Sequence, residues 1–403
     1  MTPINARPAD RWSPLYFLAS VGAGGIAVTF FMYLMFWVPH PNATVPVFED
    51  IMAAWGRGNL AQQIGIAAAM TMIAVFGVLN IRSLIWNLGQ LARFRRTPAY
   101  EKLRHSNAET QLLAMPLALA MTVNVGFIIG LVYVPNLWAV VEYLFPAAMV
   151  AFVMIGGLAL RMVGHFLGRV MTEGGIFDVT ANNSFAQLLP AFALAMVAVG
   201  LSAPAALSTS ATVVAAALTL STFFGVIAAL YAVLGAVTAL NSMLHYGTSK
   251  EASPTLMIII PLMTVLGILI LRQNHGMHTT FEGHTSAAGT FRLLSVLLTI
   301  QVMFAMLGWV ILRRHNYAST YLTGSEASPG SYALVCPGVA LTVMGFFWIN
   351  KGLVEIGAVD KFGAAYWALT AVVIAVQLAT IALVLLLNRK HLSRVQLAAV
   401  PAE

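Results

Sequence analysis

Between Asp178 and Lys250 the chain carries no aspartate, glutamate, lysine or arginine. A soluble domain is about 25% charged, whereas 9% of this chain is charged and 60% is hydrophobic. So few charges cannot cover a surface that faces water, and most of the chain must therefore have lipid as its solvent. The charge-free stretch is long enough for two spans, with turn residues at 202–204 and 208–210 between them. The sequence predicts an all-α, polytopic membrane protein.

A bilayer-spanning helix needs about 20 predominantly apolar residues. Ten charge-poor stretches meet this requirement, and we expect them to form a single transmembrane domain over residues 1–403. The first stretch is too long for the apolar core of a cleavable signal peptide, so it is interpreted as the first span. The ten predicted spans are 14–38, 60–81, 110–134, 136–160, 184–204, 210–243, 253–271, 293–312, 331–350 and 364–388.

The distribution of loop charges predicts the orientation in the membrane. With the N-terminus inside, the outside keeps only five of the 21 lysines and arginines, namely Arg57, Arg272, Arg292, Lys351 and Lys361. The inside tails and loops hold all the others, from Arg7 to Arg394. Cytoplasmic loops carry such an excess of positive charge. We therefore expect both termini in the cytoplasm, and a bacterial inner membrane as the location.

An internal repeat runs through the odd-numbered spans. Four of them carry a proline about seven residues after their polar start, in ETQLLAMPLALAMTVNVGF, NSFAQLLPAFALAMVAVGL, EASPTLMIIIPLMTVLGIL and EASPGSYALVCPGVALTVMGFF. The prolines are Pro116, Pro190, Pro261 and Pro337, at intervals of 74, 71 and 76 residues. The first span fits the same frame, with Val21 and Gly22 where the prolines fall. Each unit is a helical hairpin, and the five hairpins are approximately 12–95, 108–171, 182–245, 252–315 and 328–390.

The direction of the repeat predicts a central pore. All five units point the same way, unlike the inverted repeats of many transporters, so we expect them to close around an axis along the membrane normal. The five odd-numbered spans would then line the pore. A proline inside a helix frees a carbonyl about four residues earlier, and in a membrane such a carbonyl needs protein or water beside it. For any single proline an ordinary kink is the alternative.

The placement of charges separates classes of transporter. No acidic or basic residue falls at the centre of a predicted span, where ion-coupled pumps often have one, so a channel or facilitated carrier is favoured. No arginine lies in the predicted pore, because Arg272 is assigned to an outside loop. Phe346 and Phe347 lie past the middle of the ninth span, where an aromatic ring can close a pore by excluding water. Packing or contact with lipid is the alternative for both rings.

Candidate redox and metal groups are few. His165 and His245 lie near the inside ends of their spans, and His40, His275, His278 and His284 are assigned to outside loops, so haem ligation within the bundle is disfavoured. We expect no metal site, no cofactor, no catalytic residue and no binding of nucleic acid. The single cysteine, Cys336, precedes Pro337 on an apolar helix. It is either an inert buried thiol or a thiol at the kink of a pore helix that is open to redox chemistry.

The architecture resembles the tellurite-resistance/dicarboxylate transporter family, which includes TehA and the slow-type anion channels of plants. The runs WSPLYFLASVGAGGIAVTFF (12–31) and SYALVCPGVALTVMGFFWINKGLV (331–354) are more specifically similar to the TsoY family, which includes selenoproteins. The broader resemblance implies a homotrimer of independent pores, a phenylalanine gate on the ninth helix at Phe346 or Phe347, and small anions as substrates. The narrower resemblance makes Cys336 the candidate redox residue.

The sequence thus favours a membrane channel or carrier for a small solute, with an anion as the expected class, and does not favour an enzyme. Two alternatives stay open. In the first, the chain is a membrane redox or sensor protein, or the membrane subunit of an oxidoreductase, and uses Cys336. In the second, it is a structural membrane subunit of a partner enzyme.

Overall fold

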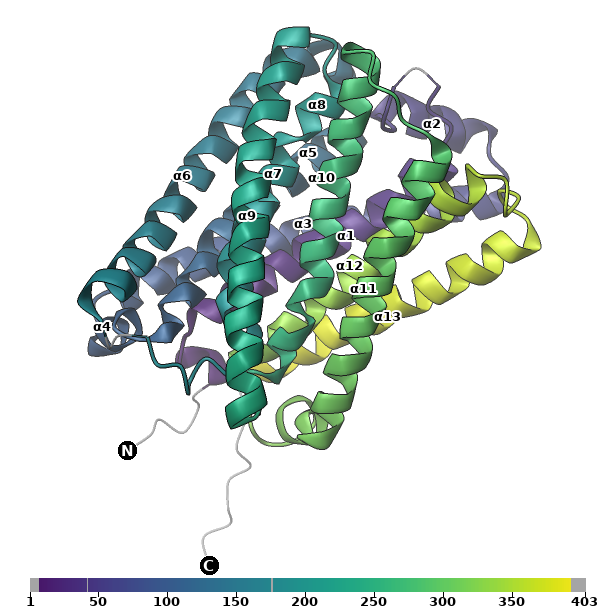
Figure 1. The fold of residues 1–403 in the computed structure, drawn as a ribbon. Coiled ribbons are helices and arrows are strands. Elements are labelled where there is room, and N and C mark those ends of the chain that lie inside the picture. The colour runs from purple at the N-terminus through teal and green to yellow at the C-terminus, as the bar shows by residue number, and fades with distance from the viewer. Residues whose placement is uncertain (1–6, 42, 175–176, 393–403) are drawn as a thin grey trace, which may run out of the picture.

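The computed structural model describes residues 7–41, 43–174 and 177–392, and within them all regular structure is helical. Ten helical segments are long and apolar enough to cross a bilayer, which confirms the predicted number of spans. Their main helices, shown in Figure 1, are α1 (Phe17–Trp37), α3 (Leu60–Phe94), α5 (Ala114–Tyr133), α6 (Val141–Glu173), α7 (Leu189–Leu201), α9 (Ala211–Tyr246), α10 (Ile259–Thr280), α11 (Ala287–Arg314), α12 (Val335–Phe347) and α13 (Ala364–Leu392). Three short helices complete the chain: α2 (Phe48–Arg57), α4 (Pro98–Arg104) and α8 (Ala203–Leu207).

Each odd-numbered span begins with a short 3-10 helix that continues directly into the α-helix. These starts are Pro14–Tyr16, Asn107–Leu113, Phe185–Leu188, Ser253–Ile258 and Pro329–Leu334. In four of the five, a serine at the N-cap accepts a hydrogen bond from the backbone N–H two residues later, as Ser13 and Ser328 do. Such a bond satisfies one of the donors that a helix start leaves free. The polar starts that recur in the sequence are therefore helix caps.

The four repeated prolines lie close to the transition from 3-10 to α-helix. Pro190 is the second residue of α7, and Pro116, Pro261 and Pro337 are the third residues of their α-helices. Each proline thus lies in the first turn of its α-helix but inside a continuous helical segment, because the 3-10 start precedes it. The freed carbonyl that we expect from each proline stays a prediction.

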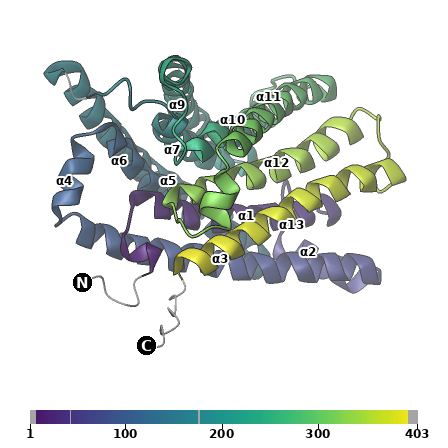
Figure 2. The same cartoon turned by 90° about the horizontal axis from the view of Figure 1, so that it is seen from below.

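The odd-numbered spans pack as a closed ring. α1 contacts α5, α5 contacts α7, α7 contacts α10, α10 contacts α12, and α12 returns to α1. Each of the five also packs against the even-numbered span that follows it in the chain. Figure 2, seen from below, shows α1, α5 and α10 toward the middle, with α3, α6, α9, α11 and α13 around them. The ring is thus a feature of the fold, whereas the descent of the five hairpins from one repeated unit stays a prediction.

Burial follows the same division between inner and outer spans. In the apolar window of Phe185–Leu207, which contains α7, 94% of the residues are buried, against 22% in the window of Ala364–Leu392. The exposed residues of the outer spans include large apolar side chains such as Leu230, Val233 and Leu385. Such a surface suits hydrocarbon and not water.

Buried amides attach outer helices to inner ones. Asn80 on α3 donates to the Ser20 carbonyl of α1 at 2.8 Å. Gln301 on α11 donates to the Ile260 carbonyl at 2.9 Å, and Gln377 on α13 donates to the Thr29 hydroxyl at 2.8 Å. Hydrogen bonds of this kind between helices are common in membrane bundles, where packing gains no hydrophobic advantage over lipid.

The first and last spans meet at one end of the bundle. The Tyr16 hydroxyl is 2.8 Å from Nδ1 of His391, so the start of the first span and the end of the tenth lie on the same face. An even number of spans requires this. That this face is cytoplasmic stays a prediction, and Arg394, one of the charges used to infer it, lies outside the described residues.

Candidate functional site

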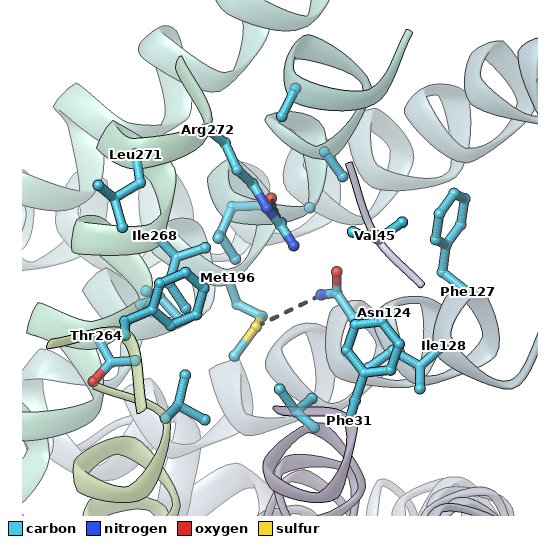
Figure 3. Close-up of a pocket in the computed structure, with 18 of the residues that line it drawn as sticks. Phe31, Val45, Asn124, Phe127, Ile128, Met196, Thr264, Ile268, Leu271 and Arg272 are labelled. Atoms are coloured by element: carbon cyan, nitrogen blue, oxygen red, sulfur yellow. Dashed lines mark hydrogen bonds between the residues drawn. The ribbon is translucent and has the colours of Figure 1, made fainter. Parts of the chain in front are cut away.

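A cavity of about 480 Å³ lies along the axis of the ring on the side away from Tyr16 and His391. All five ring helices contribute to its wall. Residues of α8 and the segment before α2, including Val45 and Pro204, line its mouth. Figure 3 shows side chains from α1, α5, α7 and α10, with Val45 of the segment before α2, around one shared space. We call this space the outer cavity.

Arg272 on α10 reaches into the outer cavity (Figure 3). Its Nη1 donates to the Val199 carbonyl at 2.8 Å, and its guanidinium forms no ion pair with any carboxylate of the described residues. Its assignment to an outside loop was wrong, because α10 does not end at residue 271 but continues to Thr280. His275 and His278, also assigned to a loop, lie on the last turns of the same helix.

The register of α10 explains why Arg272 faces the axis. Pro261, Thr264, Ile268, Arg272 and His275 follow one another at steps of three or four residues, and all five line the outer cavity. Residues at such steps share one face of a helix. Continuing the repeated proline's face along the helix would have identified Arg272, but the arginine was interpreted as the end of the span.

Asn124 on α5 points into the same space as Arg272 (Figure 3). Its amide nitrogen donates to the Ala120 carbonyl at 3.0 Å and lies 3.7 Å from the Met196 sulfur. At the mouth, Lys351 pairs with Glu355 at 2.8 Å, so these two charges offset each other. Arg272 therefore leaves the outer cavity with an uncompensated positive charge.

A second cavity, of about 320 Å³, lies at the starts of the odd-numbered spans. Its wall includes Ser13, Gln111 and the two EASP segments that open the seventh and ninth spans. Those segments interlock, since the Ser328 hydroxyl donates to the Glu251 carboxylate at 2.9 Å. We call this space the inner cavity.

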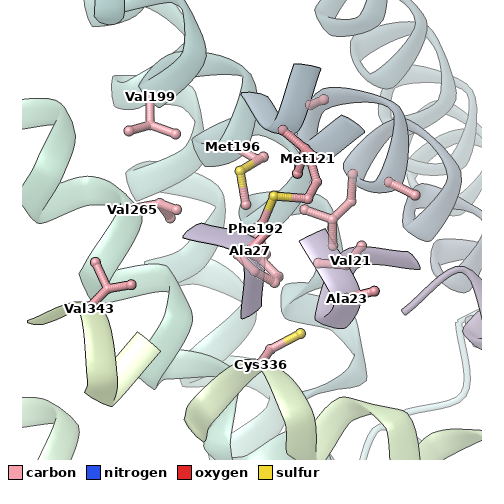
Figure 4. Close-up of a cluster of buried hydrophobic side chains, with 14 of the residues drawn as sticks. Val21, Ala23, Ala27, Met121, Phe192, Met196, Val199, Val265, Cys336 and Val343 are labelled. Atoms are coloured by element: carbon pink, nitrogen blue, oxygen red, sulfur yellow. The ribbon is translucent and has the colours of Figure 1, made fainter. Parts of the chain in front are cut away.

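Phe192, Pro261 and Cys336 line both cavities. A side chain that touches two cavities forms part of the wall between them, so these three residues mark the constriction on the axis. Figure 4 shows Phe192 and Cys336 with Met121 and Met196 at the centre of the buried cluster. Phe192 is 3% exposed and Cys336 6%, so both side chains are buried where the two cavities of the described residues are separated.

The structure separates the two phenylalanines that the sequence analysis singled out. Phe347 lines the outer cavity. Phe346 is fully buried and lines neither cavity, because its ring packs against Tyr33, Phe36 and Trp37 at centroid distances of 5.6, 6.4 and 6.2 Å. Of the four repeated prolines, Pro261 lines both the outer and the inner cavity, and Pro116, Pro190 and Pro337, which are buried in the ring, line neither of the two.

Arg272, Asn124 and Phe192 are the site residues that sequence reasoning missed. The first had a signal in the helical register, as described above. An asparagine or phenylalanine on an apolar span carries no comparable signal, since packing within the bundle and contact with a cavity call for the same residue types.

No protein-family model matches this chain. The curated proteins likewise contain no match to it. The resemblance to the tellurite-resistance/dicarboxylate transporter family therefore rests on the architecture, the resemblance to the TsoY family rests on the two runs quoted above, and both stay predictions.

Proposed function

We propose that this chain is an integral membrane channel or carrier for a small anion, which crosses the membrane along the axis of the five odd-numbered spans. The observation that carries the proposal is Arg272, a cation in a cavity on that axis with no carboxylate paired to it. Two further features support it: the closed ring of helices and the alignment of two cavities on one axis.

The energetics of a partly buried cation favour an anionic ligand. An ionised group within a membrane costs several kcal/mol unless a counter-charge or a set of dipoles surrounds it. The Val199 carbonyl supplies one dipole to Arg272. A bound anion would supply the counter-charge. Ionised residues within membrane spans are usually functional, because burying their charge is unfavourable.

The constriction bears on the choice between channel and carrier. Passage from the outer to the inner cavity requires Phe192, Pro261 or Cys336 to move, since these residues separate the two spaces. Rotation of the Phe192 side chain would open a channel. Relative movement of the ring helices would alternate access, as in a carrier.

Anion flux into liposomes that carry the purified protein tests the proposal, with chloride, nitrate, sulfite, thiosulfate and a dicarboxylate as substrates. We expect flux of at least one of these anions, and a reduction of at least about tenfold in Arg272→Gln, because loss of one favourable charge contact costs more than about 1.4 kcal/mol. Arg292→Gln, which removes an exposed arginine from α11, is the matched control and should transport normally. Absence of flux with every anion, in folded protein, would refute the proposal.

The resemblance adds a homotrimer to the proposal, and the predicted orientation adds a bacterial inner membrane. A mass measurement on the protein in nanodiscs tests the first, where three copies per particle are expected. Fractionation of the producing cells tests the second.

A redox function of Cys336 is the second candidate function, and the position of the thiol supports it. The thiol is the one cysteine of the chain, and it lies at the constriction, beside both cavities. Retention of full flux and of any oxidant response in Cys336→Ser would argue against this candidate.

A further inference from the structure

The wall of the outer cavity is polar at the mouth and apolar in its depth. Asn274, His275, Thr285, Thr290 and the Lys351–Glu355 pair lie toward the mouth. Inward from Arg272, α10 lines the cavity with Ile268, Val265, Thr264 and Pro261. At 1.5 Å per residue, Arg272 and Pro261 are about 16 Å apart along the helix. The cavity thus has a charged upper end and a deep lower part.

The one polar side chain that α10 presents in the lower part is already engaged. The Thr264 hydroxyl donates to the Ala340 carbonyl at 3.1 Å and accepts a hydrogen bond from the Gln301 amide at 2.5 Å. It therefore has little capacity left to bind a solute.

The other ring helices present the Asn124 amide, whose nitrogen lies 3.7 Å from the Met196 sulfur, and are apolar below it. Met121, Met196, Phe192 and Val343 surround this part of the axis together with Val265 of α10 (Figure 4). Below the Asn124 amide, a small inorganic anion would exchange its water shell for methyl groups and thioethers, which offer it no hydrogen-bond donors. Hydrocarbon, in contrast, binds favourably to such a wall in proportion to the area it buries.

The volume also exceeds what a small inorganic ion needs. At about 480 Å³ the outer cavity falls within the range of sites that enclose organic molecules, which are mainly apolar with a few polar groups that fix orientation. Arg272 and Asn124 are such polar groups.

We propose that the outer cavity binds an organic monoanion with an apolar body, whose acidic group pairs with Arg272 and whose hydrocarbon part lies against Met196 and Phe192. This inference rests on the proposed function and names its substrate class. A single acidic group is specified because Arg272 is the one cation of the cavity wall without a carboxylate partner, Lys351 being paired with Glu355. A second carboxylate at the far end would lie among apolar side chains.

A homologous series of carboxylates tests the inference. We would measure the dissociation constants of acetate, butyrate and hexanoate for the protein in nanodiscs by equilibrium dialysis. Each added methylene should tighten binding about fourfold until the lower part is filled. Adipate has the six carbons of hexanoate with a second carboxylate at the other end, and it should bind at least about a hundredfold more weakly than hexanoate.

Two comparisons assign the binding to Arg272. Hexanamide, the uncharged analogue of hexanoate, should bind wild-type protein at least about tenfold more weakly than hexanoate. Arg272→Gln should lose the preference for hexanoate over hexanamide, and Arg292→Gln should keep it. The wild-type comparison holds even if Arg272→Gln does not fold. Both variants are measured in the same lipid, so the partition of hexanoate into the bilayer is equal for the two and does not affect the comparison between them.

The outcomes separate this inference from the proposed function. Dissociation constants that do not change with chain length, or adipate that binds as well as hexanoate, would overturn the inference. Chloride or nitrate flux without hexanoate binding would overturn it too, while leaving anion transport intact. Graded hexanoate binding without flux of any anion would support the site and contradict transport.

Discussion

A single side chain carries most of the functional argument. Arg272 was predicted to lie in an outside loop, but its helix extends beyond the apolar stretch and turns it toward the ring axis. Lys351, which also lines the outer cavity, has Glu355 as its partner at 2.8 Å. Arg272 and Lys351 carry the same charge. They differ because Lys351 has a carboxylate partner and Arg272 has none among the described residues.

Phe346 and Phe347 should respond differently to truncation. Phe346→Ala removes a fully buried ring from its contacts with Tyr33, Phe36 and Trp37, and the expected loss of stability is about 3–5 kcal/mol. Phe347→Ala removes a partly buried ring at the cavity wall and should cost less, while changing anion flux. Thermal unfolding and liposome flux measured on both variants check this. A strong rise of flux in Phe346→Ala with normal stability would contradict the assignment.

The constriction should control access to Cys336. Because this thiol is the chain's one cysteine and is 6% exposed, a small methanethiosulfonate reagent should modify wild-type protein slowly. Phe192→Ala removes a ring from the same wall and should raise both the modification rate and the anion flux by about tenfold or more. Cys336→Ser is the unreactive control. Equal modification rates with and without Phe192 would show that this ring does not limit access.

At the scale of elements, close approach of backbones fixes the mouth of the outer cavity. A side-chain carbon at Gly276 of α10 would lie 2.2 Å from the Ala205 carbonyl oxygen of α8, and a backbone atom cannot be displaced cheaply. α8 in turn contributes Pro204 and Leu207 to the cavity wall. The glycine thus allows the contact that holds the mouth in place.

Gly276→Ala should lower stability by about 1–3 kcal/mol, because α8 has to move away from α10. Gly126→Ala is the matched control, since a carbon added there on α5 meets no atom within 4 Å. The control should leave the melting temperature unchanged or slightly higher, as alanine favours helix. Melting temperatures of both variants in the same detergent provide the measurement, and equal values would show that α8 yields without cost.

At the scale of the whole molecule, the orientation can be tested by fusions. A green fluorescent protein fused after Glu403 should fluoresce, since that fold matures in the cytoplasm. Alkaline phosphatase inserted after Gly283, between α10 and α11, should be active, since it requires the periplasm. The opposite pattern would invert the predicted orientation and place the outer cavity on the cytoplasmic side.

The fold class and the number of spans could be predicted from the sequence because the bilayer leaves few alternatives. Runs such as 184–204 and 210–243 lack charges, and in hydrocarbon they can satisfy their backbone only as helices. The repeated prolines also predicted which spans correspond to one another and placed each proline near the start of its span, whereas the 3-10 helices that precede them became clear only in the structure.

Which side chains reach the axis was decided by the tertiary structure alone. In a soluble protein the polar face of a helix points to water, so the sequence reveals the buried face. In a membrane bundle, the face toward lipid and the face toward the ring are both apolar, and that contrast is lost. Phe192 and Phe346 are equally apolar residues on inner spans, yet one lies at the constriction and the other packs against α1. Their roles depend on rotation of each helix about its own axis, which only the packing of the five ring helices against one another specifies.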